Sequence, residues 1–435
     1  MTEKIQLYPY QQDAAQTLTK VIRQCRSALD ASDTGVGKTY TALGVAKSLG
    51  AKPLVICPKS VKSMWRRTAE SFGVPLTDVC NIEQLKAGGT PYLMKLGRKK
   101  FSWRLAKDTL IIFDECHKAS GYKSENSKVL AMTKAFNYPT LLLSATVADS
   151  PLKLRAVGYL LGLHKYQDHY TWCLRNGCYQ NRWNGLDFLV GAARLPYLKA
   201  IHDQLFPAHG VRVRIQDLGD VFPDNLILAE AYDLAAKHTK EIERIYDELD
   251  EELRDPSKNT NPLTALLRAR QQVELFKVPL ITEMINEYLE EGKSVVVFVS
   301  FKETLKRIAP GLPLGVSLIV GGQPEAKRDD EIHRFQSNKT QVCLCMIQAG
   351  GVGLSLHDLT GDRPRVAILT PTYTAVELKQ ALGRIHRAGG KSKCIQKIVF
   401  AAGTVEEKAC AAVKRKLTNI SLLNDGDLTE GVWHG

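Results

Sequence analysis

Short apolar runs alternate with amphipathic stretches through the first third of the chain. The runs "PLVIC" (53–57), "TLIIFDE" (109–115) and "TLLLSAT" (140–146) are almost uninterrupted, which predicts strands buried on both faces of a parallel sheet. The stretches "KTYTALGVAKSLG" (38–50) and "SVKSMWRRTAESFG" (60–73) predict helices that each end at a glycine. Together these elements predict an α/β layer in which helices flank a parallel sheet.

The same alternation resumes near residue 265 and predicts a second α/β layer. Between the layers, "YQDHYTWCLRNGCYQNRWNG" (166–185) is aromatic and "AKHTKEIERIYDELDEELRD" (236–255) is a charged helix. We therefore expect a largely helical insertion and linker at 161–264, between an amino-terminal lobe at 1–160 and a second lobe at 265–420, followed by a tail at 421–435. The second lobe's expected elements are a helix at 266–291, strands at 294–300, 340–347 and 365–369, a helix at 374–388, a strand at 394–400 and a helix from about Thr404.

Composition narrows the class of protein. The 435 residues are 44% apolar and 24% charged, and the net charge of +13 suggests a polyanionic partner. The stretch "MTEKIQLYPYQQ" lacks the apolar core of a signal peptide, and the longest apolar runs fall far short of the ~20 residues that cross a bilayer. Ten cysteines without metal-ligand spacing favour buried free thiols. We expect a soluble intracellular protein, cytoplasmic or nuclear, neither secreted nor associated with a membrane.

The stretch "SDTGVGKT" (32–39) has the spacing of a phosphate-binding loop. Its glycines let backbone N–H groups face a phosphate at the start of a helix. Lys38 would reach the β- and γ-phosphates of ATP, and the Thr39 hydroxyl would ligate Mg²⁺. Ser32 stands where the full pattern has glycine, and it is small enough to leave the loop possible. The residues expected to contact the nucleotide are Thr34, Gly35, Val36, Gly37, Lys38 and Thr39.

The stretch "IIFDECH" (111–117) supplies candidate carboxylates. Asp114, at the carboxyl end of an apolar strand, can hold Mg²⁺ through its water shell, and Glu115 can take a proton from an attacking water. A carboxylate beside the metal ligand suits hydrolysis better than transfer to a bound acceptor, which favours an ATPase over a kinase. The stretch "SAT" (144–146) follows the next strand and is informative only because it comes after the other two motifs.

The order of these motifs resembles that of the superfamily 2 helicases and translocases, and their details look most like the chromatin-remodeller-like (SWI/SNF-type) branch. The resemblance covers nearly the whole chain and implies two RecA-like lobes of the P-loop NTPase class, with ATP between them. Cys116, within the Asp-Glu-x-His box, and Val147, after "SAT", depart from the branch pattern. The stretches that carry the resemblance are "LYPYQQ" (7–12), "SDTGVGKT", "PKS" (58–60), "DECH", "SAT", "QAGGVGLSL" (348–356), "QALGRIHR" (380–387) and "GTVEEKACAAVKRKL" (403–417).

The resemblance also implies roles for residues that spacing alone does not assign. Gln11 would read adenine, Thr146 would couple the lobes, and Gly353 would let the backbone approach the nucleotide or the nucleic acid. His117 would be a hydrogen-bonding residue between the lobes rather than a metal ligand, because no second histidine lies at ligand spacing. From the second lobe, the site would be completed by Gln380, Arg384 and Arg387, where it stays open which arginine touches phosphate.

Nucleic-acid contacts are expected on both lobes. The resemblance implies that "PKS" (Pro58, Lys59 and Ser60), Thr146 and the stretch with Gln348 and Gly350 face the strand. Independently, "KLGRKKFSWRLAK" (95–107) combines six basic residues with aromatic ones, which suits phosphate attraction by Lys99 and Lys100 and base stacking on Trp103. A solvated helix face with buried aromatics explains this stretch equally well. The aromatic stretch 166–185 could be a wedge or duplex clamp, although aromatic clusters more often belong to a core.

The function expected from these observations is an ATP- and Mg²⁺-dependent DNA helicase or translocase acting on duplex or branched DNA, with single-stranded DNA also possible. Fork or junction remodelling and branch migration would suit so compact a motor. Two alternatives stay open: an RNA helicase, because "DECH" also occurs in RNA-acting relatives, and a nucleotide-gated DNA clamp that does not separate strands.

Overall fold

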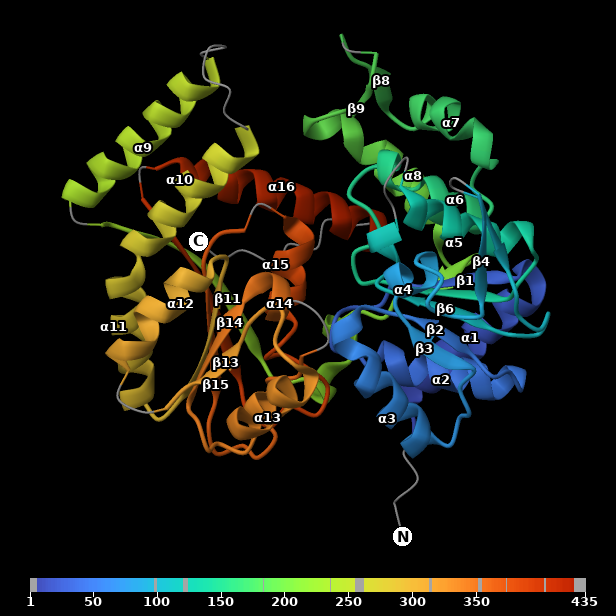
Figure 1. Cartoon of the computed structure of the whole chain (residues 1–435), viewed down its shortest axis with the longest axis horizontal. Helices are drawn as coiled ribbons and strands as arrows, with labels where there is room; N and C mark the ends of the chain where they lie inside the picture. Colours follow the sequence, from blue (N-terminus) through green and yellow to red (C-terminus); the bar gives the residue numbers. More distant parts are fainter. Residues whose placement is uncertain are drawn as a thin grey trace. The chain divides into compact units, whose positions relative to one another are not determined.

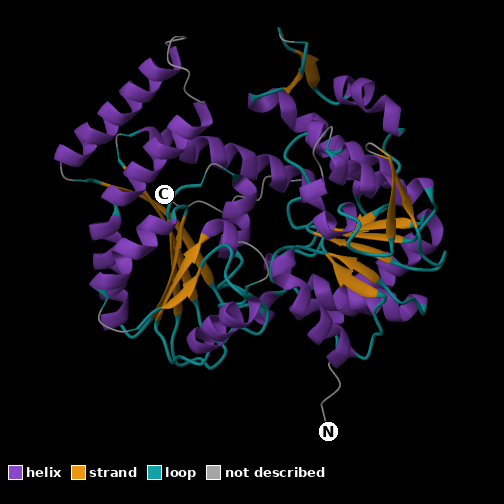
Figure 2. Ribbon diagram, in the orientation of Figure 1, coloured by secondary structure: helices purple, strands orange, loops and turns teal. Residues whose placement is uncertain are grey.

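The computed structural model describes residues 6–97, 100–119, 124–182, 184–234, 236–254, 262–312, 315–350, 354–372, 374–402 and 404–425. These residues form two units (Figure 1). Unit 1 comprises the chain up to Leu218 and again from Leu417, and unit 2 comprises Gly219–Lys416. Each unit contains one six-stranded parallel sheet with helices on both sides (Figure 2), so the predicted tandem α/β layers are confirmed.

Unit 1 is built on a sheet whose strands are short, apolar and almost wholly buried, as expected where helices cover both faces. In spatial order the strands are β10 (Gly210–Val211), β1 (Ser27–Asp30), β7 (Thr140–Leu143), β6 (Ile111–Asp114), β2 (Leu54–Ile56) and β3 (Asp78–Cys80). The helices of this unit are α1 (Pro9–Cys25), α2 (Lys38–Leu49), α3 (Lys62–Phe72), α4 (Ile82–Lys86), α5 (Glu125–Ala135), α6 (Arg155–Leu160), α7 (His169–Arg175) and α8 (Leu195–Leu205).

Glycines end the two helices that the sequence predicted first. α2 stops at Leu49 and α3 at Phe72, and the following Gly50 and Gly73 adopt left-handed backbone angles, with φ of 64° and 69°. These angles are strained for residues with a Cβ. Two hairpins add to unit 1: β4 (Leu93–Gly97) pairs with β5 (Lys100–Trp103), and β8 (Cys178–Gln180) pairs with β9 (Leu186–Phe188).

Unit 2 repeats the plan with a second parallel sheet. Its strand order is β11 (Asn225–Tyr232), β16 (Cys394–Ala401), β15 (Arg365–Leu369), β12 (Ser294–Val299), β14 (Val342–Met346) and β13 (Ser317–Ile319). Its helices are α9 (Ala236–Arg254), α10 (Pro262–Phe276), α11 (Val278–Glu290), α12 (Lys302–Ile308), α13 (Glu325–Gln336), α14 (Ile347–Gly350), α15 (Ala375–Leu382) and α16 (Val405–Asp425), the last of which extends into unit 1.

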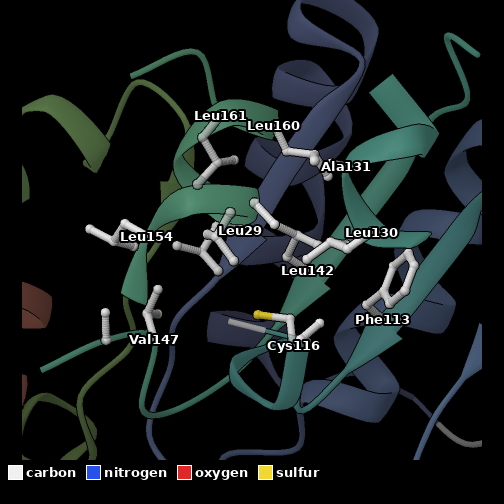
Figure 3. Packing of buried hydrophobic residues seen from close by; sticks show 14 of the residues in the cluster. Leu29, Phe113, Cys116, Leu130, Ala131, Leu142, Val147, Leu154, Leu160 and Leu161 are labelled. Carbon is white, nitrogen blue, oxygen red and sulfur yellow. The ribbon is translucent and has the colours of Figure 1, made fainter. Parts of the chain in front are cut away.

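The core of unit 1 joins the sheet to the helices above it. Leu29, Phe113 and Leu142 project from three neighbouring strands and meet Leu130 of α5 and Leu160 of α6 (Figure 3). Leu422 and Leu423, near the end of α16, belong to the same core.

All ten cysteines are free thiols; Cys25 is exposed, Cys410 is half-buried and the other eight are buried. In the described part of the chain, no helix is both long and apolar enough to cross a membrane.

The structure divides the chain differently from the expected three segments. Residues 161–218 belong to unit 1 and residues 219–264 to unit 2, so the aromatic and charged stretches are parts of the two units rather than one insertion. The aromatic stretch forms α7 and the β8–β9 hairpin, whereas α9 packs on α10 through Ile245, Leu249, Ala265 and Ala269. From Leu417, the chain returns to unit 1 instead of closing the second lobe.

Two predicted helices are shorter in the structure. The helix expected at 266–291 is broken into α10 and α11 at Lys277, because Pro279 lacks an N–H and its ring clashes with the preceding turn. The helix expected at 374–388 ends at Leu382. Arg384 and Arg387 therefore lie beyond α15 rather than along an amphipathic helix.

Candidate nucleotide site

Four motifs of the sequence meet at one edge of the unit 1 sheet. The nucleotide loop (residues 32–39) follows β1, "DECH" ends β6, "SAT" follows β7 and "PKS" follows β2. The register places Asp30 opposite Leu143 and Leu143 opposite Asp114, so the strands end side by side. Because ligands of open parallel sheets bind beyond the carboxyl ends of the strands, this edge is the candidate site.

The nucleotide loop turns sharply before α2. Gly35 and Gly37 have φ values of 99° and 90°, and a Cβ at position 37 would clash with the Gln11 side chain. Lys38 begins α2, and its Nζ donates to the carbonyls of Ser32 (2.7 Å) and Asp33 (2.9 Å). Burial lowers the pKa of Lys38, while Asp30, Glu115, Asp33 and Asp114 act in the opposite direction. The lysine therefore lies within electrostatic reach of both carboxylates of "DECH".

Gln11 connects helix α1 to this loop. Its side chain is 4% exposed, its Nε2 donates to the Val36 carbonyl (2.8 Å), and its Oε1 accepts from the Tyr8 N–H (3.1 Å). The Tyr10 hydroxyl donates to the same carbonyl (3.0 Å). Gln11 thus supports the nucleotide loop, a contact that the sequence did not predict, and its reading of adenine stays a prediction.

Asp114 is held by a tryptophan that the sequence analysis did not assign to the site. The indole Nε1–H of Trp65, a fully buried residue of α3, donates to Asp114 Oδ2 at 2.9 Å. Burial and the neighbouring Glu115 raise the pKa of Asp114 to about 6, and the Trp65 hydrogen bond opposes this rise. In the sequence, Trp65 belongs to the helix predicted at 60–73, and that pattern does not assign it to the site.

Glu115 is connected to the "SAT" loop through His117. Glu115 has a positive φ of 55°, a conformation that non-glycine residues seldom adopt. His117 Nδ1 lies 3.3 Å from Glu115 Oε2, 2.9 Å from Ser144 Oγ and 3.5 Å from Thr146 Oγ1. Burial lowers the pKa of His117 to about 3, so the ring is neutral near pH 7 and its contact with Glu115 is not an ion pair.

The residues of this edge fit ATP with a divalent cation. Gly35 and Gly37 give the loop backbone angles that residues with a Cβ seldom adopt, and Lys38 and the first turn of α2 provide positive charge. Burial and then the neighbouring Glu115 raise the pKa of Asp114, and a cation with oxygen ligands would favour the charged form of this carboxylate.

The site residues expected from the second lobe lie in unit 2. Arg384 is 2% exposed and its Nη1 donates to the Leu354 carbonyl (3.3 Å). Arg387 is half-buried, and its Nη1 donates to Ser355 Oγ (2.8 Å). Gln380 is 4% exposed on α15. Both arginines therefore pack against the segment just after "QAGGVG", and Gly353 lies outside the described residues.

The residues expected to contact nucleic acid differ in their exposure to solvent. Trp103 is 4% exposed and lies in the core of unit 1, so the expectation of base stacking on it is corrected to a packing role. Thr146 is 2% exposed, so in this structure its side chain has no surface to offer a strand. Lys59 and Gln348 are exposed, and contacts of Pro58, Lys59, Ser60, Gln348 and Gly350 stay predictions. Lys99 and the side chain of Lys100 lie outside the described residues.

Comparison with known proteins shows the family to which the chain belongs. Residues 277–389 match the model of the helicase conserved C-terminal domain. A protein of Acanthamoeba polyphaga mimivirus with the provisional name ATP-dependent RNA helicase L364 is 34% identical over 97% of this chain and 84% of its own length. The chain belongs to the superfamily 2 helicases. This helicase is accordingly a nucleic-acid-dependent ATPase.

Other relatives that match part of the chain are named for chromatin remodelling and for DNA repair. The CHD3-type chromatin-remodeling factor CHR7 of Arabidopsis thaliana is 28% identical over 32% of this chain and 12% of its own length. The RAD54-like DNA repair and recombination protein of Drosophila pseudoobscura pseudoobscura is 26% identical over 35% of this chain and 20% of its own length. Among solved structures, the Sulfolobus solfataricus SWI2/SNF2 ATPase core in complex with dsDNA aligns over 98% of this chain and 94% of that one, at 18% identity and a TM-score of 0.38.

Proposed function

We propose that this helicase hydrolyses Mg²⁺–ATP at the edge of the unit 1 sheet and uses the cycle to move along, or remodel, duplex or branched DNA. The observation that carries the proposal is the register of β1, β7 and β6, because these strands end side by side and bring the loop with Lys38 to the same sheet edge as Asp114 and Glu115. The names of the chromatin-remodelling and DNA-repair relatives support DNA as the substrate. Such an activity implies a site of action inside the cell, in the cytoplasm or nucleus.

The roles of the unit 1 residues follow from their chemistry. Lys38 would exchange its two carbonyl partners for phosphate oxygens, and Thr39 and Asp114 would hold Mg²⁺, which neutralises phosphate charge when bound. Among the described residues, no group of three or more His, Cys, Asp or Glu side chains could hold a metal ion, which agrees with a cation shared with the nucleotide. Glu115, held by neutral His117, would take the proton of the attacking water.

Burial separates the roles of the two arginines. Arg387 keeps exposed surface, so we assign the γ-phosphate contact to it, whereas buried Arg384 would fix the segment around Leu354. Gln380 would act with them from α15. A guanidinium suits this task because it stays charged and spreads its charge over several donors.

The nucleic-acid track would combine main-chain and small polar contacts of Pro58, Lys59 and Ser60 with those of Gln348 and Gly350. Such contacts bind phosphate without reading sequence. The net charge of +13 supports an electrostatic contribution to binding.

One experiment separates the DNA proposal from its alternatives: ATPase rates measured with single-stranded DNA, duplex DNA, a four-way junction and RNA. We expect the largest stimulation with duplex or junction DNA. Stimulation by RNA alone would favour the RNA-helicase alternative, for which the name of the mimivirus relative speaks. Binding of DNA without any stimulated turnover would indicate a nucleotide-gated clamp.

Two variants test the residue assignments in the same assay. Lys38→Ala should abolish stimulated hydrolysis while DNA binding, followed by fluorescence anisotropy, persists. Arg387→Ala should lower kcat by at least about 10³-fold if it acts as an arginine finger, with ATP affinity little changed. Wild-type turnover in Lys38→Ala, or a loss of ATP affinity alone in Arg387→Ala, would refute the corresponding assignment.

A further inference from the structure

The arm that leads into the nucleotide loop, residues 29–33, is bordered by a segment from a distant part of the chain, residues 209–215. Three main-chain hydrogen bonds join alternate residues of the two: Leu29 N–H to His209 O (3.0 Å), Ala31 N–H to Val211 O (2.9 Å) and Asp33 N–H to Val213 O (3.0 Å). Side chains of the arm add two more acceptors, Ser32 Oγ for the Val213 N–H (3.0 Å) and Asp33 Oδ2 for the Ile215 N–H (3.1 Å). Ser32, the departure from the glycine of the loop pattern, thus has a structural use.

The side chain of Arg212 also connects residues 209–215 to residues 29–33, and we call this pair of segments the junction. Its side chain is 8% exposed, and all three of its nitrogens are engaged: Nη1 donates to Ala31 O (2.8 Å), Nη2 pairs with Asp33 Oδ1 (2.8 Å), and Nε pairs with Asp425 Oδ1 (2.6 Å). Burial works against its charge, yet Asp33 and Asp425 together raise the pKa of Arg212 above its ordinary value. A rigid, planar guanidinium spreads its donors over three nitrogens, whereas a lysine presents all its N–H donors from a single atom.

Asp425 is the last residue of α16, and its side chain is 4% exposed. Ser421 Oγ donates to its second oxygen at 2.9 Å. The adjoining Asn424 Nδ2 donates to the carbonyl of Ala145 at 2.9 Å, in the "SAT" loop. The end of α16 therefore contacts two motif-bearing loops of unit 1, one directly and one through Arg212.

Arg212, which pairs with Asp33, and Asp425, which pairs with Arg212, both lie near the points where the chain passes between the units. The chain leaves unit 1 after Leu218 and re-enters it at Leu417. Arg212 lies just before the first passage, and Asp425 lies just after the second. The first passage is thus linked to Asp33 directly through Arg212. The second passage is linked to it indirectly, because Asp425 binds Arg212.

We propose that Arg212 is a positioning residue for the nucleotide loop, that Asp425 of α16 holds Arg212 in place, and that this junction sets the affinity of the loop for nucleotide. The proposal deepens the proposed function, because it rests on residues 32–39 binding ATP. Movement at either chain passage would loosen the arm, and nucleotide binding would tighten it in return, since such coupling is reciprocal.

The test measures the Kd of a fluorescent ADP analogue with Mg²⁺, on the full-length protein without nucleic acid. Asp425→Asn keeps the shape of the side chain and removes its charge, without altering the loop itself. We expect its Kd to rise by at least about fivefold, the lower range of coupling between sites. The control is Arg194→Gln, because Arg194 is also buried and binds Asn419 on the same helix, away from the nucleotide loop. Its Kd should stay within about twofold of wild type.

Arg212→Lys and the double variant complete the cycle, and circular dichroism selects the folded variants. If Asp425 acts through Arg212, the double variant binds ADP no more weakly than the weaker single variant. Independent, multiplying effects would overturn the proposal, as would unchanged Kd values in folded Asp425→Asn and Arg212→Lys. If Lys38→Ala binds the analogue normally, the proposed nucleotide site itself fails, which is a separate result.

Discussion

Single residues show both what spacing in the sequence can predict and what it cannot. Lys38, Asp114 and Glu115 could be assigned because each stands at the end of a predicted strand or the start of a predicted helix. The Trp65–Asp114 hydrogen bond could not, because it joins two residues 49 positions apart, and no local pattern records which buried indole faces which carboxylate. For the same reason, the basic and aromatic stretch around Trp103 suited two opposite interpretations until its burial was known.

The Trp65 contact leads to a prediction at this scale. Trp65→Phe retains an aromatic ring but removes the donor to Asp114, so the carboxylate loses its orientation. Mutating the hydrogen-bond partner of a metal ligand typically lowers metal affinity or activity by about 10–100-fold. We therefore expect the Mg²⁺ concentration for half-maximal ATPase activity to rise by about tenfold or more, measured by Mg²⁺ titration at saturating ATP.

Trp103→Phe is the matched control for this change. It makes the same substitution at another buried tryptophan of unit 1, and no hydrogen-bond partner of the Trp103 indole N–H is found among the described residues. Its Mg²⁺ dependence should equal that of wild type. Equal shifts in the two variants would mean that Trp65 acts only by packing.

At the scale of elements, the break between α10 and α11 brings a charged residue into the core of unit 2. Lys277 stands at this break, and its side chain is 1% exposed. Its Nζ pairs with Glu406 Oε1 at 2.7 Å, and Glu406 Oε2 accepts from the Ala401 N–H at 2.9 Å. The sequence "KVP" contained the signal for the break, because proline ends helices, but apolar periodicity across 266–291 concealed it.

Removing one member of this pair should lower the free energy of unfolding. Lys277→Met leaves Glu406 buried without its cation, and breaking a buried pair in this way costs about 3–5 kcal/mol. The urea midpoint of unit 2 unfolding should fall accordingly, and Lys277→Met with Glu406→Gln should recover part of the loss. Lys306→Met, which breaks the exposed Lys306–Glu303 pair of α12 in the same unit, should cost no more than about 1 kcal/mol. A double variant as unstable as Lys277→Met alone would argue against the buried charge as the cause.

At the scale of the whole molecule, the two α/β layers were predictable because buried parallel strands leave uninterrupted apolar runs in the sequence. The division of the chain was not. The length and pattern of α16 give its helical character, but nothing in them indicates that the helix begins in unit 2 and ends in the core of unit 1. Likewise, the pairing of residues 209–213 with β1 and the residues after it depends on contacts between distant parts of the chain.

The arrangement of the cysteines has a practical consequence for studying movement on nucleic acid. Cys25, at the end of α1, is exposed, whereas eight of the ten thiols are buried, and burial raises the pKa of Cys80, for instance, to about 12. Because the thiolate is the reactive form, a maleimide dye would attach first at Cys25, in the native sequence. The enzyme therefore carries its own attachment point for a fluorescent dye, seven residues before the nucleotide loop in the sequence.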